Sequence, residues 1–451
     1  MTDYKPFIFK LEQSDNKILD KPIDKKKDVI ISPIINYPSL SLGYHYFIHR
    51  TKESMERTNQ LESKNKFYYI VNPFEHTISN HDEDLTNDTK KFFKMKDNDP
   101  KILSRAFYKM WEMLVYFDIG SKKDLNYAAL AEGPGSFLQA VLKFREQYNY
   151  DLKKDKYFGV TIHPENGSNI EMGKQFLGHY DKKYPELINV HKTYPIETAN
   201  KYKGKSNGDI TNVKTISLFK KEIAKNKKYS DLVTADGGFD WDDENFQEQE
   251  AYQLILGELI AAIRVQNSKG SFVLKLFETF TLVSIKLVYL VSSFYEESYI
   301  CKPLFSRSSN SEKYLICKGF KYDQVKDSKI LDQKIKNLED ILTLLSSDEY
   351  LQDIYPNLVL PDSYIEDFKF INIMVANEQQ IMINKIITYI DGNNYYGDDY
   401  HAYKSNSIEA TKWWNETFFK DKIDVTNNLK YTKNISDYNK KEKSIYFSTD
   451  K

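Results

Sequence analysis

The stretch Ala131-Glu132-Gly133-Pro134-Gly135-Ser136-Phe137 decides the fold of this 451-residue chain. It follows a short apolar run at 127–130 and leads into an apolar-rich segment that starts at Leu138, a pattern that predicts a strand, a tight turn and a helix. We expect Gly133 and Gly135 to take positive φ, so that the backbone can approach a ligand closely. The first amides of the helix would then face that ligand.

The residues of this turn restrict what it can bind. Glu132 would repel a phosphate and suits a ligand that offers a positive charge or hydroxyl groups. No Gly-Lys-Ser/Thr follows the turn, which excludes a P-loop, and Leu138 or Gln139 stands where a dinucleotide fold would place a third glycine. Taken alone, the motif fits an ordinary glycine turn of an α/β domain equally well.

The composition excludes several classes of protein. Lys and Arg number 64 against 65 Asp and Glu, so nucleic-acid binding would need a local basic face. Only Cys301 and Cys317 are present, which excludes a zinc site built mainly from cysteines and a disulfide scaffold, and suits a reducing compartment. The histidines show no metal-binding helix motif, so we expect no metal site.

No segment of the sequence has the pattern of a signal peptide or a membrane span. The longest apolar stretch, near 281–294, contains Lys286 and is too short to cross a bilayer. We therefore expect an intracellular, soluble protein without a membrane partner.

The first part of the chain has few clear patterns. The aromatic-rich segments 43–50 and 67–71 favour strands. Asp99 and Pro100 form a typical helix start, an N-cap followed by proline, and apolar residues recur at helical spacing up to Leu114. Lys109 lies on this expected helix, where a solvent-exposed lysine is the ordinary interpretation.

Strands and helices alternate after the glycine turn. We expect 163–207 to be mostly loop, strands at 157–162, 230–234, 271–277, 298–303 and 312–320, and helices at 216–224, 245–266 and 281–294. This order predicts an α/β fold with a doubly wound sheet and an antiparallel last strand. Asp236, followed by two glycines at a strand's carboxyl end, is well placed for a site. Lys275 interrupts an apolar strand and is either outward-facing or a buried charge with a role.

The pattern becomes helical from about residue 326. Helices are expected over 330–345 and 365–390, with a last helix docked by Trp413, Trp414 and neighbouring phenylalanines. We expect the Lys- and Asn-rich tail from about 426 to be partly mobile.

Several motifs together resemble a known family. The segment 104–109, the turn at Glu132, Asp236, the segment 270–275 and the strand that starts at Glu312 occur in the order found in RrmJ/FtsJ-like RNA 2′-O-methyltransferases. The resemblance covers about residues 100–322. It implies a Rossmann-like sheet that binds S-adenosylmethionine (SAM), with an N-terminal extension of mixed structure (1–95), a methyltransferase domain (96–325) and a mainly helical C-terminal extension (326–451).

The residues after Asp236, the aspartate that the resemblance implies to be catalytic, point to one subgroup of the family. Ribosomal members of the family usually continue with Ala-Pro-Asn or a similar sequence, whereas Gly237-Gly238-Phe239 follows here. With the motif 302–314, this resembles the mRNA cap 2′-O-methyltransferases of eukaryotes and large cytoplasmic DNA viruses. The implied substrate is capped RNA, with capping-enzyme or polymerase subunits as candidate partners. The implied location is the cytoplasm or nucleus, or a viral factory or virion if the source is viral.

The resemblance assigns roles to individual residues. The family's Lys-Asp-Lys-Glu tetrad would be Lys109, Asp236, Lys275 and Glu312. The residues implied for SAM binding are Glu132, Gly133, Pro134, Gly135, Ser136, Phe137, Asp209 and Asp236, with Glu132 attracting the ammonium and Asp209 contacting the adenine. Thr161-Ile162-His163 stands where the family often has a ribose-binding acid, so the ribose contact stays unassigned.

The tetrad residues suit methyl transfer to a ribose hydroxyl. Lys275 is the candidate base for the 2′-hydroxyl, which requires its pKa to fall from about 10.4 through burial or through neighbouring Lys109. Asp236 and Glu312 would oppose that shift, so Lys275 is either neutral before reaction or mainly orients the hydroxyl. Lys109 would help to stabilise the developing oxyanion.

The RNA-binding residues are less defined by the sequence. Candidates for substrate contacts are Arg105, Lys302, Arg307 and Phe239, with Lys313, Trp241 and Phe246 as further basic or aromatic residues near the site. Each of them fits a solvated surface charge or a packing aromatic as well.

Three other functions remain open. The tetrad residues could form a buried ion-pair network in an inactive relative, the chain could methylate ribosomal or transfer RNA, or it could be a non-catalytic RNA-binding or scaffold subunit of a capping complex. The intact tetrad argues against the first and third of these alternatives, and Gly237-Gly238 argues against the second.

Overall fold

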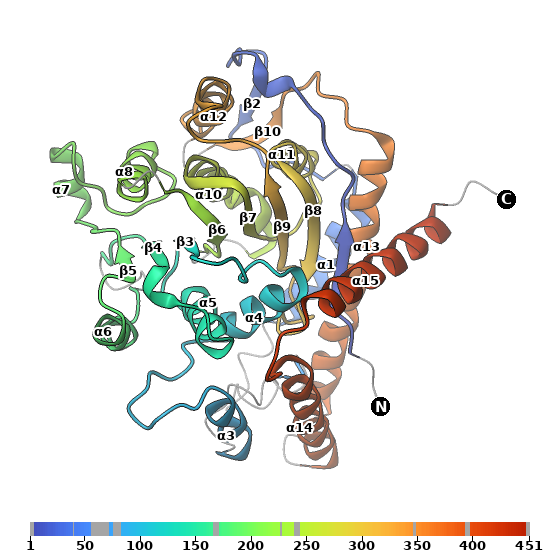
Figure 1. Cartoon of the computed structure of the whole chain (residues 1–451). Helices are drawn as coiled ribbons and strands as arrows, with labels where there is room; N and C mark the ends of the chain where they lie inside the picture. Colours follow the sequence, from blue (N-terminus) through green and yellow to red (C-terminus); the bar gives the residue numbers. More distant parts are fainter. Residues whose placement is uncertain are drawn as a thin grey trace.

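The computed structural model describes residues 4–38, 40–55, 72–74, 83–165, 171–225, 228–238, 244–345, 349–392 and 397–447. At its centre lies an eight-stranded sheet in the order β1-β8-β9-β7-β6-β3-β4-β5 (Figure 1). The strands are β1 (Phe7–Lys10), β3 (Asn126–Leu130), β4 (Lys156–Val160), β5 (Ile188–Val190), β6 (Ser230–Ala235), β7 (Gln266–Leu276), β8 (Tyr295–Lys302) and β9 (Lys313–Phe320).

The sheet is parallel on one side and antiparallel on the other. β3, β4, β5, β6 and β7 run parallel to one another, whereas β9 is antiparallel to both β7 and β8. The predicted Rossmann-like α/β fold with an antiparallel closing strand is therefore confirmed. β1 adds an antiparallel edge strand beside β8, which the sequence did not predict.

Helices cover both faces of the sheet because its strands bury side chains on both. Along β3, Tyr127 and Ala129 belong to one hydrophobic cluster, and Ala128 and Leu130 belong to the other. The helices of the central part of the chain are α4 (Ala106–Phe117), α5 (Ser136–Gln147), α6 (Lys174–Lys183), α7 (Ile196–Lys201), α8 (Val213–Ala224), α9 (Gln247–Glu250), α10 (Tyr252–Val265) and α11 (Leu282–Ser292).

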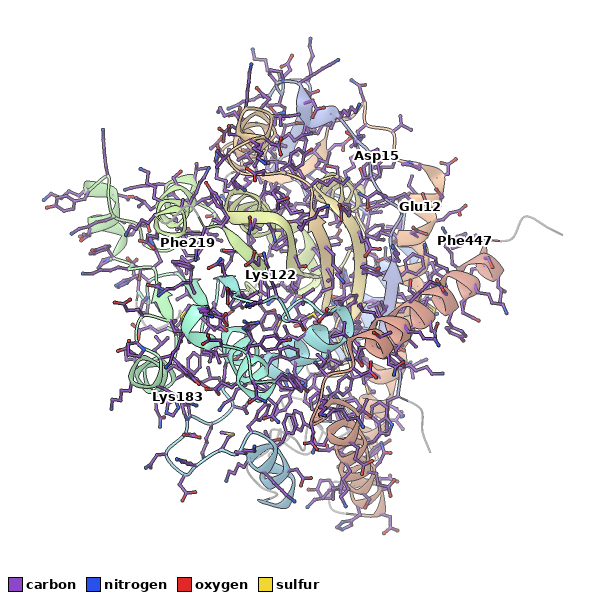
Figure 2. All side chains as sticks on the ribbon, in the orientation of Figure 1. Glu12, Asp15, Lys122, Lys183, Phe219 and Phe447 are labelled. Carbon is purple, nitrogen blue, oxygen red and sulfur yellow. The ribbon has the colours of Figure 1, made fainter. Side chains whose placement is uncertain are left out.

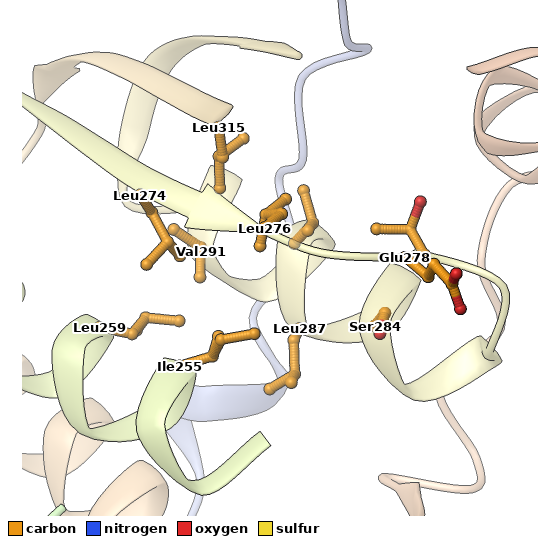
Figure 3. Close-up of a pocket in the computed structure, with 11 residues that line it drawn as sticks. Ile255, Leu259, Leu274, Leu276, Glu278, Ser284, Leu287, Val291 and Leu315 are labelled. Atoms are coloured by element: carbon orange, nitrogen blue, oxygen red, sulfur yellow. The ribbon is translucent and has the colours of Figure 1, made fainter. Parts of the chain in front are cut away.

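Side chains fill the space between these layers (Figure 2). Phe219 of α8 is fully buried, whereas Lys183 lies at the periphery, with its side chain about half exposed. A gap of about 10 Å³, lined mainly by apolar residues such as Leu259 of α10, Leu274 of β7 and Leu287 of α11, remains in the core (Figure 3). It has room for about one water molecule and is a packing gap rather than a ligand site.

Both extensions pack onto the central sheet. β2 (Val29–Ser32) pairs with β10 (Tyr350–Ile354) in a separate two-stranded sheet, so the two extensions also meet each other. The helices outside the central part are α1 (Leu42–Glu53), α3 (Glu83–Phe92), α12 (Ser328–Leu342), α13 (Asp362–Asp391), α14 (Asp398–Phe418) and α15 (Val425–Tyr446). The boundaries after residues 95 and 325 remain predictions.

The expectation of a strand at 43–50 is wrong. Segment 43–50 lies in the helix α1 instead of a strand, because His45, His49 and Lys52 recur at helical spacing on the side that contacts Glu278 and Phe280. Segment 67–71 lies outside the described residues.

The expected helix start at Asp99 is also wrong, because α4 begins at Ala106. The residues before it are held in a non-helical conformation by Gln139 of α5, whose side chain accepts the Leu103 N–H at 2.9 Å and donates to the Lys101 carbonyl at 2.9 Å.

Two later segments are more ordered than predicted. Part of the expected loop at 163–207 forms α6, β5 and α7. Isolated aromatic residues of this segment, such as Phe176 and Tyr180 in α6, are buried. The tail from about 426 forms α15 instead of a mobile segment, because Ile435, Ser436 and Asn439 are buried on one face of that helix.

Candidate active site

The tetrad predicted from the sequence comes together at one edge of the sheet. Asp236 directly follows β6, and Lys275 lies near the end of β7, so both lie at the carboxyl edge of the parallel strands. Glu312 directly precedes β9, and since β9 is antiparallel to β7, its start lies at the same edge. Lys109 lies in the first turn of α4.

Lys109 and Glu312 form a buried ion pair. The Lys109 Nζ lies 2.6 Å from Glu312 Oε1, and Ser306 Oγ donates to the same oxygen at 3.1 Å. Burial alone would raise the pKa of Glu312, but Lys109 and Lys275 outweigh it and lower the value to about 2. The Glu312 carboxylate is therefore charged at any physiological pH, and it fixes the Lys109 ammonium.

Asp236 and Lys275 form the second pair. The Lys275 Nζ lies 3.5 Å from Asp236 Oδ1 and donates to the Asp236 carbonyl at 2.9 Å, while the Tyr314 hydroxyl donates to Oδ1 at 3.1 Å. Burial would lower the pKa of Lys275, but Asp236 and Glu312 outweigh it and raise the pKa above its ordinary value. The requirement for a lowered pKa, stated for a base at this position, is not met in the ligand-free protein.

A cleft opens beside Asp236 and Lys275. It has a volume of about 250 Å³, and its lining is formed by Ser104, Ala106, Ala131, Glu132, Gly133, Pro134, Ser136, Phe137, Asp236, Gly238 and Lys275. Most of the residues predicted to bind a cofactor therefore share one cavity with two members of the tetrad. A cleft of this size is close to the range that holds a nucleoside-sized ligand.

The glycine turn, residues 131–137, lines the cleft and has unusual backbone torsion angles. Gly135 has a φ of 108°, in the region that favours glycine, and it directly precedes the first helical residue, Ser136. The expectation of positive φ at Gly133 is wrong. The residue with φ of 51° is Ala131, and the Gly133–Pro134 peptide bond is cis. The first amides of α5 therefore lie at the cleft, where a negatively polarised group would be favoured.

Glu132 is the buried acid of this cleft. It is only 3% exposed, and its Oε1 accepts the Leu138 N–H at 2.9 Å. Burial raises the pKa of Glu132 to about 8, with the backbone amide of Leu138 opposing the shift and Asp236 adding to it. A cationic ligand would supply the positively charged partner that Glu132 lacks in its described contacts. The residue therefore suits an ammonium group such as that of SAM.

Glu258 of α10 shapes the turn after Asp236. Its Oε1 accepts the Gly237 N–H at 3.0 Å, and a Cβ added to Gly237 would lie 2.4 Å from the same oxygen. Gly237 therefore cannot be replaced without moving Glu258. A Cβ on Gly238 would lie 3.3 Å from Lys275 Nζ, so these glycines keep the reacting side of the cleft open.

Asp209 lies apart from the residues that line the cleft. Its Oδ1 accepts the backbone N–H of Thr211 at 2.9 Å and the Thr211 hydroxyl at 2.7 Å. Gly208, with φ of 82°, brings this turn against the Thr161 carbonyl at the end of β4. An adenine contact by Asp209 remains a prediction.

The four candidate substrate residues differ in their surroundings. Lys302 is only 5% exposed, and its ammonium contacts oxygens of its own chain, including the Glu312 carbonyl at 2.8 Å. That environment favours a structural role for Lys302 over an RNA contact. Arg105 and Arg307 are half-buried beside α4 and in the loop before β9, and Phe239 lies outside the described residues.

Three side chains of the site have roles that the sequence did not predict. Tyr314 and Ser306 hold the two acids of the tetrad, and Glu258 holds the turn after Asp236. Tyr314 and Ser306 belong to the motif 302–314, which ends at the start of β9. Their short spacing from Glu312 in that motif could have indicated that they contact the tetrad. Glu258 lies within an apolar helix, where a single acid among buried residues is the only hint.

The part of the chain that the structure describes contains no group of three or more His, Cys, Asp or Glu side chains placed to hold a metal ion. Within the same residues, no helix is long and apolar enough to cross a membrane. Both cysteines are free and buried.

The sheet order, the turn after β3 and the polar cleft define an α/β domain with a ligand cleft at the carboxyl edge of its parallel strands. Residues 102–320 match the family of FtsJ-like methyltransferases. This part of the chain is therefore similar to FtsJ-like methyltransferases, the family that its motifs resemble.

Curated relatives carry more specific names. A cap-specific mRNA (nucleoside-2′-O-)-methyltransferase 1 of Trypanosoma cruzi is 33% identical over 218 residues, which cover 47% of this chain and 52% of the relative. The human protein of the same name is 32% identical over 208 residues, or 45% of this chain and 22% of the relative. The chain thus matches about half of the length of the first relative and a smaller part of the length of the second.

The chain was also compared with solved structures. A crystal structure described as a ribosomal RNA methyltransferase from Plasmodium falciparum is 22% identical and covers 48% of this chain and 97% of that chain. Its TM-score of 0.33 is too low to support a conclusion.

Proposed function

We propose that this protein transfers a methyl group from SAM to a ribose 2′-hydroxyl next to the 5′ cap of mRNA. The observation that carries the proposal is the convergence of Lys109, Asp236, Lys275 and Glu312 at the edge of a cleft whose other wall is the glycine turn. The cap-specific names of the curated relatives support the choice of capped RNA as the substrate.

The cleft fits SAM by its chemistry. Glu132 can accept the ammonium of the amino-acid end, and the backbone at Gly133 and Gly135 leaves room for a ligand along the turn. Asp209 is the candidate for the adenine. When bound, SAM supplies an electrophilic methyl group on its sulfonium.

The tetrad then has to place the ribose hydroxyl. Because its neighbours raise the pKa of Lys275, this side chain is an ammonium in the ligand-free protein, and we infer that it orients the 2′-oxygen rather than removing its proton beforehand. The hydroxyl would become strongly acidic as its oxygen bonds to the methyl group and the methyl–sulfur bond breaks, which would leave a neutral thioether. Its proton could then pass to water. Lys109, held by Glu312, stabilises charge that develops at the same oxygen.

A pair of lysine variants on one strand tests these roles. We expect Lys275→Met to lower methyl transfer to capped RNA by about 10²–10³-fold, the usual cost of removing one preorganised donor. SAM affinity should stay within about twofold, since Glu132 and the glycine turn are unchanged. Lys269→Met on β7, far from the cleft and paired with Glu296, is the control and should keep full activity. Equal activity of the two variants would contradict the assignment.

A further inference from the structure

The loop between β8 and β9, residues 303–312, delivers Glu312 to the tetrad. Side chains from both extensions of the chain hold this loop, which we call the β8–β9 loop, although the family match ends at residue 320. The contacts hold the start, the middle and the end of the loop.

The start of the loop is held by a buried carboxyl group on α4. Glu112 is fully buried, and its oxygens accept the N–H groups of Leu304 at 2.7 Å and Phe305 at 3.1 Å. The indole N–H of Trp414, from α14, donates to the same carboxyl group at 3.1 Å. One carboxyl group thus joins α4, the loop and the C-terminal extension.

Phe305 anchors the same part of the loop by packing. Its ring lies 4.6 Å from that of Tyr108 and 5.0 Å from that of Trp414, measured between centroids. Asn72, from the N-terminal extension, donates to the Phe305 carbonyl at 3.2 Å. Both extensions therefore contact this single residue of the loop.

The middle and end of the loop are held from two other directions. Gln379 of α13, only 1% exposed, donates to the Ser309 carbonyl at 3.1 Å. The Lys302 ammonium contacts Ser306 Oγ at 3.2 Å, the Asn310 carbonyl at 2.9 Å and the Glu312 carbonyl at 2.8 Å. Every part of the loop that leads to Glu312 therefore has a buried polar partner.

We propose that Trp414 and Gln379, in the C-terminal extension, are positioning residues for the Lys109–Glu312 pair. This inference rests on the proposed function. Glu112 lies one helical turn after Lys109 on α4, so the bonds of Glu112 fix the loop relative to the helix that carries Lys109. Displacements of about 1 Å in a catalytic group can lower a rate by about 10²-fold.

This arrangement predicts a specific kinetic signature. The SAM cleft is lined by the glycine turn, by the residues after β6, by Lys275 of β7 and by Ser104 and Ala106 at the start of α4. None of the residues that hold the loop from the C-terminal extension lines it. Loosening the loop should therefore lower kcat and leave the KM for SAM unchanged. A purely structural role would instead lower stability and leave the rate of the folded protein unchanged.

Three variants of the full chain test the proposal. Trp414→Phe removes the indole donor, Gln379→Met removes the donor to Ser309 at similar volume, and Trp413→Phe is the matched control on α14, where Trp413 packs on Tyr4 instead. We expect the first two to lower kcat about tenfold. Both should also speed amide hydrogen exchange in residues 303–312, with the KM for SAM constant within about twofold, whereas the control should change neither property.

The two readouts separate this inference from the proposed function. Unchanged kcat and unchanged exchange in both variants would overturn the positioning role, and either variant suffices if the other fails to fold. If the wild-type protein transfers no methyl group to capped RNA, the proposed function fails. Exchange in residues 303–312 then decides alone whether the extension holds the loop.

Discussion

At the scale of single residues, Glu132 shows how burial prepares a site for a charged ligand. Its carboxyl group is almost inaccessible and has no cationic partner in the described contacts, and burial raises its pKa to about 8. At neutral pH it therefore carries a proton in the ligand-free protein. A bound ammonium would favour the carboxylate, so cofactor binding and proton release are linked.

This linkage gives a measurable prediction. At pH 7, below the raised pKa, binding of SAM should release up to about one proton, and the release should fade as the pH rises above about 8. Calorimetry in two buffers of different ionisation enthalpy measures it. The Glu132→Gln variant should release none. Glu112→Gln is the control, because Glu112 also has a pKa near 8 but lies outside the cleft. Release that is unchanged in Glu132→Gln would contradict the role of Glu132.

The resemblance implied which residues would form the tetrad but not their protonation. The family resemblance selected Lys109 and Glu312, and the folded chain brings Lys109 Nζ within 2.6 Å of Glu312 Oε1. The protonation state of Lys275 depends on the balance between its burial and the carboxylates of Asp236 and Glu312, and that balance is a property of the folded chain.

At the scale of elements, the start of α4 depends on a side chain from another helix. Gln139 of α5 forms two hydrogen bonds with the backbone at Lys101 and Leu103 and keeps this segment out of the helix. Ser104 Oγ, 2.8 Å from Ser136 Oγ, adds a second link between the same two segments. The N-cap pattern at Asp99 could not reveal these contacts, because they join residues more than thirty positions apart.

Replacing this side chain should loosen the segment before α4. Gln139→Met has a similar volume but leaves the Leu103 N–H and the Lys101 carbonyl without their partner. We expect a loss of about 1–3 kcal/mol in the free energy of unfolding. Urea denaturation measures it as a lower midpoint at a constant m-value. Gln147→Met, at the end of the same helix, is the control and should shift stability by less than about 0.5 kcal/mol. Equal effects would contradict this explanation of the helix start.

At the scale of the whole molecule, the two ends of the chain meet on the edge of the sheet. α15 packs on β1 and α4 (Figure 1). Asn439 donates to the Ile8 carbonyl at 2.8 Å, and Ser436 Oγ accepts the Lys10 N–H at 2.9 Å. These side chains occupy backbone groups of β1 that would otherwise be open at an edge, and covered edges resist pairing with other chains.

This contact predicts a stability difference along one helix. Asn439→Leu would leave the Ile8 carbonyl unpaired and should lower the free energy of unfolding by about 1–3 kcal/mol. Asn434→Leu, on the exposed face of α15, should change it by less than about 0.5 kcal/mol. Thermal and urea unfolding of both variants measure the difference. A loss of the same size at Asn434 would show that α15 does not seal this edge.

The central sheet could be predicted because its strands are short apolar runs separated by clear helices. The edge strand β1 and the α15 tail could not, since β1 pairs with the distant strand β8 and α15 packs on β1, more than 400 residues away. Sequence patterns report local periodicity, whereas Asn439 and Ile8 are paired by the path of the whole chain. The cleft lies within the part of the chain that local patterns describe well, whereas the extensions depend on contacts between distant segments.

The most direct test of the central claim is methyl transfer from labelled SAM to three short RNAs of one sequence, followed by nuclease mapping of the label. The RNAs are capped, uncapped, and capped with 2′-deoxyribose at the two cap-proximal nucleotides. We expect label on a cap-proximal 2′-oxygen of the capped RNA only. Equal labelling of the uncapped RNA at internal positions, or no labelling despite measurable SAM binding, would contradict the proposed cap ribose methylation.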